Sequence, residues 1–225
     1  MRSIVIAIDG YSGCGKSTLA KQLAEKLNYI FLDTGAMYRA VTLYLMDHGI
    51  DWNDPLALQD ALAHIHISCE TEKGGRSQVL LNGMHVEDRI RTMEVAGKVS
   101  EVAAVSAVRR FLVKQQQQIG EQGGIVMDGR DIGTVVFPDA ALKIFVTARM
   151  EVRVHRRLKD LHAKGIAADA EDVEANLRKR DLEETSRKDS PLLRADDAIL
   201  LDNSDLTPEA QLQWAFDLAA GRISA

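Results

Sequence analysis

The sequence has little of what marks disulfide-rich, secreted or membrane-spanning proteins. Its two cysteines, Cys14 and Cys69, are too few for a disulfide framework and favour a reducing compartment. Its longest apolar runs are far shorter than the roughly 20 residues that span a bilayer. The start of the chain reaches Asp9 before an apolar signal region could form. We therefore expect a cytoplasmic protein with no membrane partner.

An excess of basic residues is also missing. The chain has 28 Lys and Arg against 33 Asp and Glu, a net charge of −5, whereas nucleic-acid-binding domains usually carry a basic surface. We expect no nucleic-acid partner. With 46% hydrophobic and 27% charged residues, the chain has the composition of a globular protein and not of a disordered or fibrous one. Its 225 residues fit one large domain or two small ones.

Short apolar runs alternate with longer amphipathic stretches along most of the chain. The runs predict buried strands, at residues 4–8, 29–32, 125–127, 142–146 and 198–201. Apolar residues at helical spacing predict helices after the glycine-rich turn that follows the first strand, and at residues 36–46, 93–119, 152–162, 172–183 and 208–219. This alternation predicts an α/β fold, with a mostly parallel sheet flanked by helices.

One segment breaks the alternation. Ile65, Ile67 and Cys69 fall on one face of a half-exposed strand, and the Asn-Gly dipeptide at residues 82–83 predicts a tight turn between two further strands. We therefore predict a small antiparallel β insert over about residues 62–92.

The segment after the first predicted strand, GYSGCGKS, fits the P-loop pattern GxxxxGK[ST]. Its glycines let backbone N–H groups turn toward phosphate oxygens, Lys16 adds a charge near the β- and γ-phosphates, and the Ser17 hydroxyl can ligate Mg²⁺. The following helix points the positive end of its dipole at the same phosphates. We predict that ATP is bound by Gly10, Tyr11, Ser12, Gly13, Cys14, Gly15, Lys16, Ser17 and Thr18.

A P-loop alone does not distinguish switch GTPases, motor ATPases and small-molecule kinases. The guanine-reading NKxD motif is absent from the sequence. Residues 125–128 predict a strand that ends in an acid, as in a Walker B motif, so Asp128 is a candidate to hold Mg²⁺ directly or through water. The alternative is that Asp128 only caps the end of its strand.

Two further motifs follow predicted strands. In DTGAMYRA, Thr34 is placed to cap the next helix, and Arg39 lies about one turn further on, where it is either a contact for an acceptor phosphate or an ordinary solvated arginine. In DGRDIGTVVFP, the pair Arg130 and Asp131 is flanked by glycines directly after a buried strand. Open α/β sheets bind their ligands at this edge.

These motifs belong to five segments, GYSGCGKST (10–18), DTGAMYRA (33–40), IRTMEVA (90–96), DGRDIGTVVFPDA (128–140) and SPLLRADDAILLD (190–202). With them the sequence closely resembles the bacterial-type cytidylate kinases, a subgroup of the P-loop nucleoside monophosphate kinases. The resemblance extends essentially from end to end, and DGRDIGTVVFP is far more specific to this family than the P-loop.

The resemblance implies one P-loop kinase domain over residues 1–225, with the nucleoside monophosphate kinase fold. Its monophosphate-binding region is expected at about residues 34–119, including the β insert, and a short lid at about 150–187. The implied reaction transfers the γ-phosphoryl group of ATP, carried with Mg²⁺, to CMP or dCMP, and gives ADP and the nucleoside diphosphate.

The resemblance also implies how the base is selected. Asp131 accepts a hydrogen bond from the N4 amino group of cytosine, and Arg109 donates to the acceptor edge of the base, with Ser100 nearby. Uracil has a carbonyl and an N–H in place of these groups, so it would repel the carboxylate and leave the arginine unpaired. Since losing a polar match of this kind costs several kcal/mol, the pair is expected to reject UMP strongly.

Arginines take most of the remaining implied roles. The implied catalytic residues are Lys16, Arg130 and Arg180, because in-line phosphoryl transfer needs charge neutralisation and no protein nucleophile. The residues implied in CMP binding are Thr34, Arg39, Ser100, Arg109, Arg130, Asp131, Arg180, Glu184 and Arg187, and Arg156 and Arg157 form the lid over ATP. Glu184 stands where the family usually has Asp, and is one methylene longer with the same charge.

Two other functions are compatible with a P-loop. One is another small-molecule kinase, acting on UMP, AMP or a shikimate-like acceptor, and the other is a nucleotide switch without enzymatic activity. We expect a monomer, which suits a moving lid.

Overall fold

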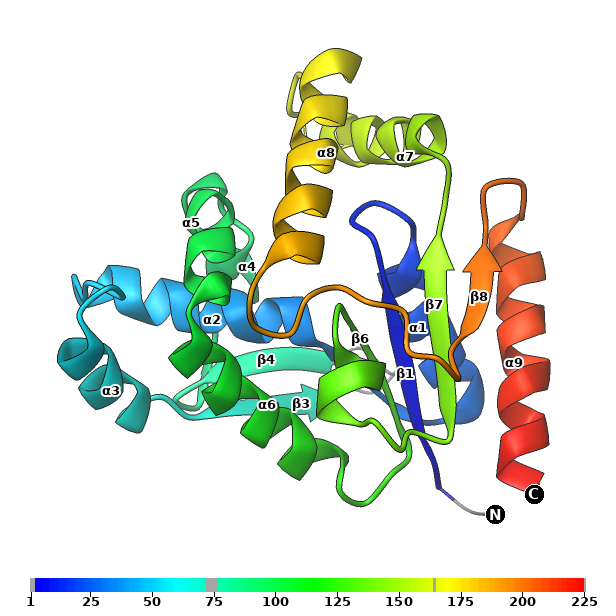
Figure 1. Cartoon of the computed structure of the whole chain (residues 1–225), viewed down its shortest axis with the longest axis horizontal. Helices are drawn as coiled ribbons and strands as arrows, with labels where there is room; N and C mark the ends of the chain where they lie inside the picture. The colour runs from blue at the N-terminus through cyan, green and yellow to red at the C-terminus, as the bar shows by residue number, and fades with distance from the viewer. Residues whose placement is uncertain (1–2, 72–76, 164, 225) are drawn as a thin grey trace.

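The computed structural model describes residues 3–71, 77–163 and 165–224. At its centre, five of the described strands form one sheet in the order β2-β6-β1-β7-β8, and every neighbouring pair is parallel (Figure 1). The strands of this sheet are β1 (Val5–Gly10), β2 (Ile30–Asp33), β6 (Ile125–Gly129), β7 (Leu142–Thr147) and β8 (Ile199–Asp202). The predicted parallel sheet is therefore confirmed, and its strands all end at one edge.

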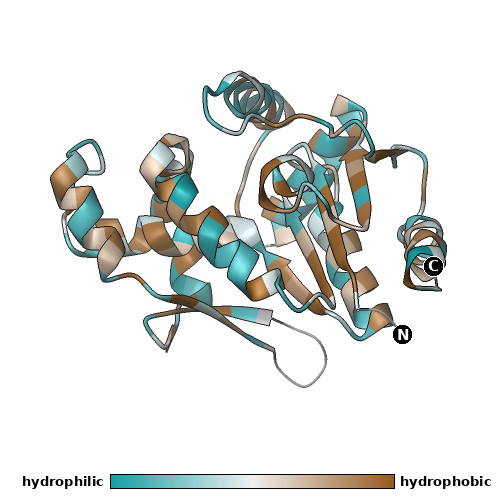
Figure 2. Ribbon diagram, turned by 60° about the horizontal axis from the view of Figure 1, so that its bottom comes forward, coloured by the Kyte–Doolittle hydropathy of each residue, from teal (hydrophilic) through white to brown (hydrophobic). Residues whose placement is uncertain are grey.

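Helices cover both faces of this sheet. Successive residues of a strand point to opposite faces, and both faces carry apolar side chains that the helices bury. The described helices are α1 (Lys16–Leu27), α2 (Thr34–Asp47), α3 (Pro55–Ala63), α4 (Glu87–Ile90), α5 (Met93–Ala104), α6 (Ser106–Gly120), α7 (Met150–Ala163), α8 (Ala170–Ser186) and α9 (Pro208–Ser224), with one π-helical turn, η1 (Ile132–Val136). Ile6 and Ile8 of β1 pack in a core with α1 and α9, whereas Ala7 between them packs in a second core with α2 and α6. Figure 2 shows this as hydrophobic central strands between helices with one polar face.

The predicted helix over residues 93–119 is wrong in one respect, because two helices occupy this segment. Val105 adopts an extended conformation, with φ −76° and ψ 117°, and separates α5 from α6. Apolar residues continue at helical spacing across the break, so periodicity alone does not reveal it. The break leaves the Ala103 carbonyl without a partner in its helix, and Arg109 donates to it from α6 at 3.1 Å. The interruption thus helps to hold Arg109.

The predicted β insert is present as a three-stranded antiparallel sheet in the order β3-β4-β5. Its strands are β3 (Ile67–Thr71), β4 (Ser77–Leu81) and β5 (Met84–His85). Asn82 and Gly83 both have positive φ, at 50° and 79°, as a type I′ turn requires. Ile67 and Val79 are buried in the same core as α2, so the insert packs on that helix. Residues 72–76 of the predicted insert lie outside the described residues.

The segment predicted as a lid contains the helix pair α7 and α8. Figure 1 shows both helices beyond the edge at which β7 and β8 end. Val154 on α7 packs against Val173 and Leu177 on α8 in a small core of their own. Residue 164, between the two helices, lies outside the described residues. Every helix in the described part of the chain is too short or too polar to cross a lipid bilayer.

Candidate active site

The P-loop joins β1 to α1 and depends on glycine where the chain passes close to β7. Gly10 has φ 150°, and a Cβ there would lie 2.1 Å from the Val146 carbonyl oxygen, so no other residue fits without moving β7. Lys16 is buried at the start of α1, and its Nζ donates to the Tyr11 carbonyl at 3.3 Å. Burial and the neighbouring Arg130 lower the pKa of Lys16. The Lys16 side chain thus folds back over the P-loop, where its ammonium group can bind an anion such as a phosphate.

Ser17 and Asp128, the two candidate metal ligands, are in contact at the first turn of α1. The Ser17 hydroxyl donates to one carboxylate oxygen of Asp128, and the other oxygen is buried without a hydrogen-bond partner in the described part of the chain. Burial, followed by the charge of Asp33, raises the pKa of Asp128 to about 6. A hydroxyl beside a carboxylate with a free oxygen is a donor set that Mg²⁺ prefers. These residues therefore fit a magnesium ion.

A cluster of opposite charges lies directly above the P-loop. Glu184 on α8 accepts from Arg130 Nε at 2.6 Å and from Arg180 at 3.2 Å, and the Arg130 guanidinium also donates to the Ser12 hydroxyl at 2.8 Å. Burial raises the pKa of Glu184, but the two arginines and Lys16 outweigh it and lower the pKa to about 2. Burial and Arg130 lower the pKa of Arg180. The negative charge of Glu184 thus offsets part of the positive charge of Arg130, Arg180 and Lys16 in the absence of bound phosphate.

A second polar cluster is buried further along the same sheet edge. Arg109 and Asp131 form an ion pair, and both side chains are almost inaccessible to solvent. Tyr38 and Arg187 lie around this pair, and burial raises the pKa of Tyr38 to about 12. Three buried atoms here have no hydrogen-bond partner among the described residues: Tyr38 Oη, Arg109 Nε and Arg187 Nη2. Buried polar atoms without partners indicate a place that a polar ligand fills.

Arg39 lies near Arg180 of the first cluster, among other arginines. Its guanidinium donates to the Ile90 carbonyl at 3.3 Å, and its neighbours include Arg91, Arg157 and Arg180. Burial, followed by these arginines, lowers the pKa of Arg39. Cations gathered in this way are stabilised by an anion such as a phosphate.

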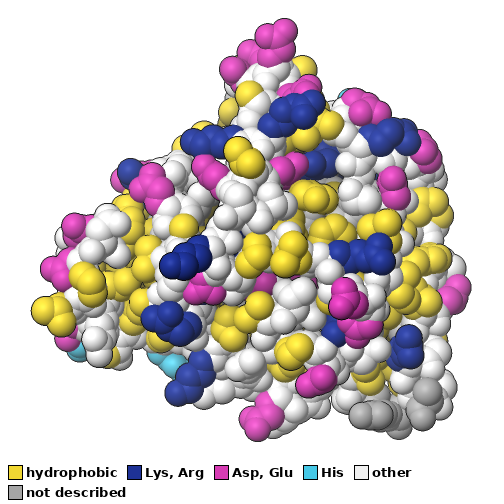
Figure 3. All heavy atoms as spheres, viewed as in Figure 1, with side chains coloured by type: hydrophobic (Ala, Val, Ile, Leu, Met, Phe, Trp, Pro, Cys, Tyr) yellow, Lys and Arg dark blue, Asp and Glu magenta, His cyan; other side chains and the backbone are white. Residues whose placement is uncertain are grey.

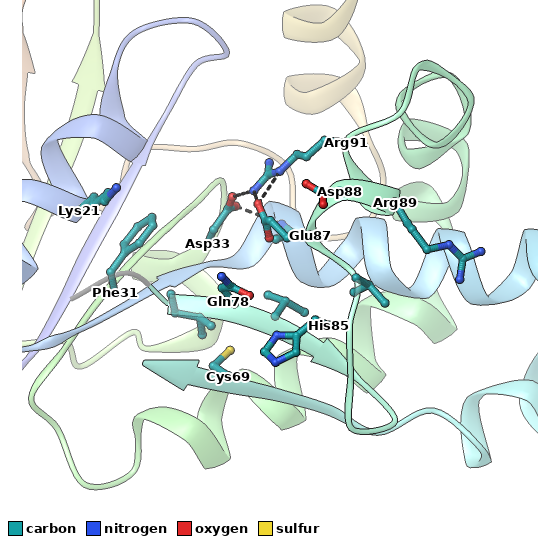
Figure 4. A pocket seen from close by; sticks show the side chains of 14 residues that line it. Lys21, Phe31, Asp33, Cys69, Gln78, His85, Glu87, Asp88, Arg89 and Arg91 are labelled. Atoms are coloured by element: carbon teal, nitrogen blue, oxygen red, sulfur yellow. Dashed lines mark hydrogen bonds and ion pairs between the residues drawn. The ribbon is translucent and has the colours of Figure 1, made fainter. Parts of the chain in front are cut away.

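Arg91 connects this region to the β insert (Figure 4). Arg91 lines a pocket of about 570 Å³, and it donates to Asp33 at 2.8 Å and to Glu87 at 2.9 Å. Asp33 also accepts from the Ala36 N–H at 3.1 Å and so caps α2. The ion pair therefore ties α4 to the N-terminus of the helix that carries Arg39.

Comparisons with known proteins agree with this geometry. A family model for cytidylate kinase matches residues 6–217. This chain belongs to the cytidylate kinase family. A cytidylate kinase of Parabacteroides distasonis is 53% identical over an alignment 224 positions long, which covers 96% of this chain and 96% of its own. One from Cytophaga hutchinsonii is 48% identical over 99% of this chain and 96% of its own. The chain is thus an enzyme, and the predicted family and kinase class are confirmed.

A solved structure of a protein with little sequence identity to this chain has the same fold as this member of the cytidylate kinase family. A shikimate kinase from Bacteroides thetaiotaomicron aligns over 96% of this chain and 98% of its own, with a TM-score of 0.50 and 16% identity. At that identity the match concerns the fold alone. The predicted P-loop kinase fold, with its parallel sheet, flanking helices and β insert, is confirmed.

One structural expectation for the predicted site residues of this kinase is wrong, and two of these residues are exposed. Thr34 does not cap α2, because Asp33 does; the Thr34 hydroxyl instead donates to the Asp128 carbonyl at 2.7 Å. Thr18 is exposed on α1. Ser100 is exposed on α5, so it is not buried with the base-reading residues Arg109 and Asp131. The nucleotide contacts predicted for these residues stay predictions.

The predicted lid arginines of the kinase differ from each other. Arg157 is exposed and faces Arg39 and Arg180. Arg156 donates to the Cys14 carbonyl at 3.1 Å and to the Asn203 side chain at 2.9 Å, so it supports the P-loop.

Sequence reasoning missed three residues that hold the kinase site together. Arg153 forms a two-bonded ion pair with Asp181 at 2.7 Å and donates to the Ser12 carbonyl at 2.8 Å, which links both lid helices to the P-loop. Asn203 is completely buried and donates to the Cys14 carbonyl at 2.8 Å. The third is Asp9, buried at the end of β1. The sequence signal that could have pointed to Asp9 is its position as an acidic residue directly before Gly10, the first glycine of the P-loop.

Proposed function

We propose that this cytidylate kinase family member transfers the γ-phosphoryl group of ATP to CMP or dCMP, and that the residues predicted from the sequence carry the reaction. The observation that carries the proposal is the buried pair of Arg109 and Asp131 beside polar atoms that lack partners. In this proposal the monophosphate-binding region spans about residues 34–119 and the lid about 150–187. Monomeric state and cytoplasmic location stay predictions.

The donor is held by the P-loop, and its γ-phosphoryl group points toward the arginines above it. Backbone N–H groups and Lys16 bind the phosphates. Ser17 and the free oxygen of Asp128 would hold Mg²⁺, directly or through water, and the ion would neutralise charge on the phosphates of ATP. In this proposal Arg130 and Arg180 neutralise charge on the transferring phosphoryl group. Glu184, which pairs with both arginines in the structure, gives up part of that pairing to bind the acceptor ribose. The phosphate oxygen of the acceptor needs no general base.

The acceptor is held at the second cluster. Arg39 contacts its phosphate, and Arg187 and Tyr38 surround the nucleoside. Asp131 accepts from the N4 amino group of cytosine, while the unpartnered Arg109 Nε supplies a donor to the acceptor edge of the base. Binding a base that satisfies both groups replaces buried polar atoms without partners by hydrogen bonds. Uracil presents a carbonyl to the Asp131 carboxylate and an N3–H to Arg109, so only its O2 remains as an acceptor for the arginine.

An assay of ADP release with a panel of acceptors tests the proposed function. CMP and dCMP should each support rapid ADP release in the presence of ATP and Mg²⁺, and UMP and AMP should be at least about a hundredfold less efficient in kcat/KM. Faster release with UMP, AMP or shikimate would indicate one of the other small-molecule kinases. Equally fast release without an acceptor would indicate an ATPase or switch and would refute the proposal.

Replacing Asp128 by asparagine should make the unliganded protein more stable and the enzyme less active. The folded-state pKa of about 6 lies above the usual 3.8, so the ionised carboxylate destabilises the folded protein at neutral pH. Asp128→Asn removes this cost, up to about 3 kcal/mol at pH 8. As the pH falls through 6 toward 4, wild-type Asp128 becomes protonated and the stability gap should close.

Thermal or urea unfolding of both proteins at pH 8 and pH 5 measures this gap. Kinase assays at several Mg²⁺ concentrations test the loss of the metal ligand. An Asp128→Asn protein that is less stable than wild type at pH 8 would contradict the assigned direction of the pKa shift.

A further inference from the structure

A buried carboxylate that the mechanism has not used joins the donor loop to the base-reading pair. Asp9 is the next-to-last residue of β1, directly before Gly10 of the P-loop, and its side chain is 5% exposed. One of its oxygens accepts from the Ile132 N–H at 2.9 Å, and the other accepts from the Gly133 N–H at 2.8 Å. These two residues follow Asp131 directly.

The two N–H groups belong to the first turn of η1, for which Asp131 is the N-cap residue. The first N–H groups of a helical turn have no partner within it, and an Asp at the N-cap ordinarily accepts from them with its own side chain. Asp131 makes no such bond, and its carboxylate is paired with Arg109. Asp9 therefore supplies the cap from another strand, which leaves Asp131 free to face Arg109.

The surroundings of Asp9 fit this role. A Cβ on Gly133 would lie 3.3 Å from Asp9 Oδ2 and 3.1 Å from Lys143 Cδ, so glycine lets this N–H approach the carboxylate closely. The charged groups that face Asp9 are Asp131, which repels it, and Lys16, which attracts it. Burial raises the pKa of Asp9 to about 6 although both N–H bonds lower it. The ionised form is the one that accepts both bonds.

We propose that Asp9 is a positioning residue for selection of the acceptor base: by capping η1 from β1, it keeps the Asp131 carboxylate turned toward Arg109 and the base. The proposal rests on the proposed function, since it concerns how the same base-reading pair is held. Without this cap, the freed N–H groups of η1 attract the Asp131 carboxylate back onto its own turn. Base selection then weakens although Asp9 touches neither nucleotide.

The test is Asp9→Asn, assayed for kcat/KM with CMP and with UMP. The asparagine keeps the size of the side chain but turns an NH₂ group toward one of the two N–H donors. The ratio of CMP to UMP efficiency should fall roughly tenfold, the equivalent of one charge-assisted hydrogen bond. A merely structural role would lower both efficiencies equally and leave their ratio unchanged, and that result in a folded variant would overturn the proposal.

Asp54→Asn is a matched control, because Asp54 also accepts from two backbone N–H groups, those of Leu56 and Ala57, at the exposed start of α3. It should keep the wild-type ratio. If circular dichroism shows that Asp9→Asn does not fold, Gly133→Ala takes its place, because a Cβ at residue 133 would lie 3.3 Å from Asp9 Oδ2 and crowd this contact. An unchanged ratio in that variant also overturns the proposal. A wild-type enzyme with no CMP preference would refute the proposed function itself, which separates the two failures.

Discussion

Replacing Arg180 by alanine should lower kcat about a thousandfold with CMP and with UMP alike. An arginine that stabilises a transferring phosphoryl group contributes a factor of this size or more. In the described structure Arg180 donates one hydrogen bond, to Glu184 at 3.2 Å, and its other neighbours Arg130 and Arg157 are cations. Its charge is thus only partly neutralised before phosphate binds. Removing it should leave folding intact, because Glu184 keeps the shorter contact with Arg130.

Arg178 on the same helix provides the matched control. It is exposed and pairs only with Glu174, one turn earlier on α8, in the described structure. Arg178→Ala should keep kcat near the wild-type value, because exposed ion pairs contribute little. Steady-state kinetics with both acceptors measure the difference. If Arg180→Ala stays within about threefold of wild type, Arg180 has no part in the transfer step.

Replacing Asp131 by asparagine should change which base is accepted. Because Arg109 needs an acceptor, the amide oxygen stays turned toward it. The amide nitrogen then faces the base, where this donor repels the N4 amino group of cytosine and suits the O4 carbonyl of uracil. We expect kcat/KM for CMP to fall at least about a hundredfold, about 2.7 kcal/mol, while the value for UMP stays the same or rises. The notable result is therefore the loss of preference, which kinetics with CMP and UMP measure directly. An equal loss with both acceptors would contradict the role of Asp131 in reading the base.

The same substitution should also destabilise the protein. Arg109 is 2% exposed, and a buried arginine without its carboxylate costs roughly 3 to 5 kcal/mol. Urea unfolding of the variant measures this cost and shows whether the kinetics refer to folded enzyme. Asp139 follows η1 and is exposed, so Asp139→Asn should change neither stability nor base preference.

Much of the fold could be predicted because local patterns determine it. The apolar run at the start of the chain, the glycine-rich turn and the helix after it each have their own signal, and their order fixes where phosphate binds. The break at Val105 has no such signal, because apolar residues keep helical spacing across it. The sequence predicts the cap of α2 one residue too late, at Thr34, for a similar reason. Asp33 and Thr34 are both capping residue types, and only the structure shows that Asp33 has the extended φ and ψ angles of the N-cap.

The site could be predicted only as far as its motifs extend. Arg109 and Arg110 are adjacent in the sequence, and the structure distinguishes them because Arg109 is buried against Asp131 while Arg110 is exposed. Arg153 lies on the same helix as the predicted lid residues Arg156 and Arg157, yet it is paired with Asp181 and the P-loop backbone. These assignments depend on partners far away in the chain, which no local pattern contains.

The most direct test of the central claim follows the transferred phosphoryl group itself. The enzyme is mixed with Mg²⁺, CMP and ATP that carries a radioactive γ-phosphate, and the products are separated by chromatography. The proposed reaction predicts that label leaves ATP and appears in CDP, in an amount equal to the ADP formed. Label that appears as inorganic phosphate, whether or not CMP is present, would contradict it.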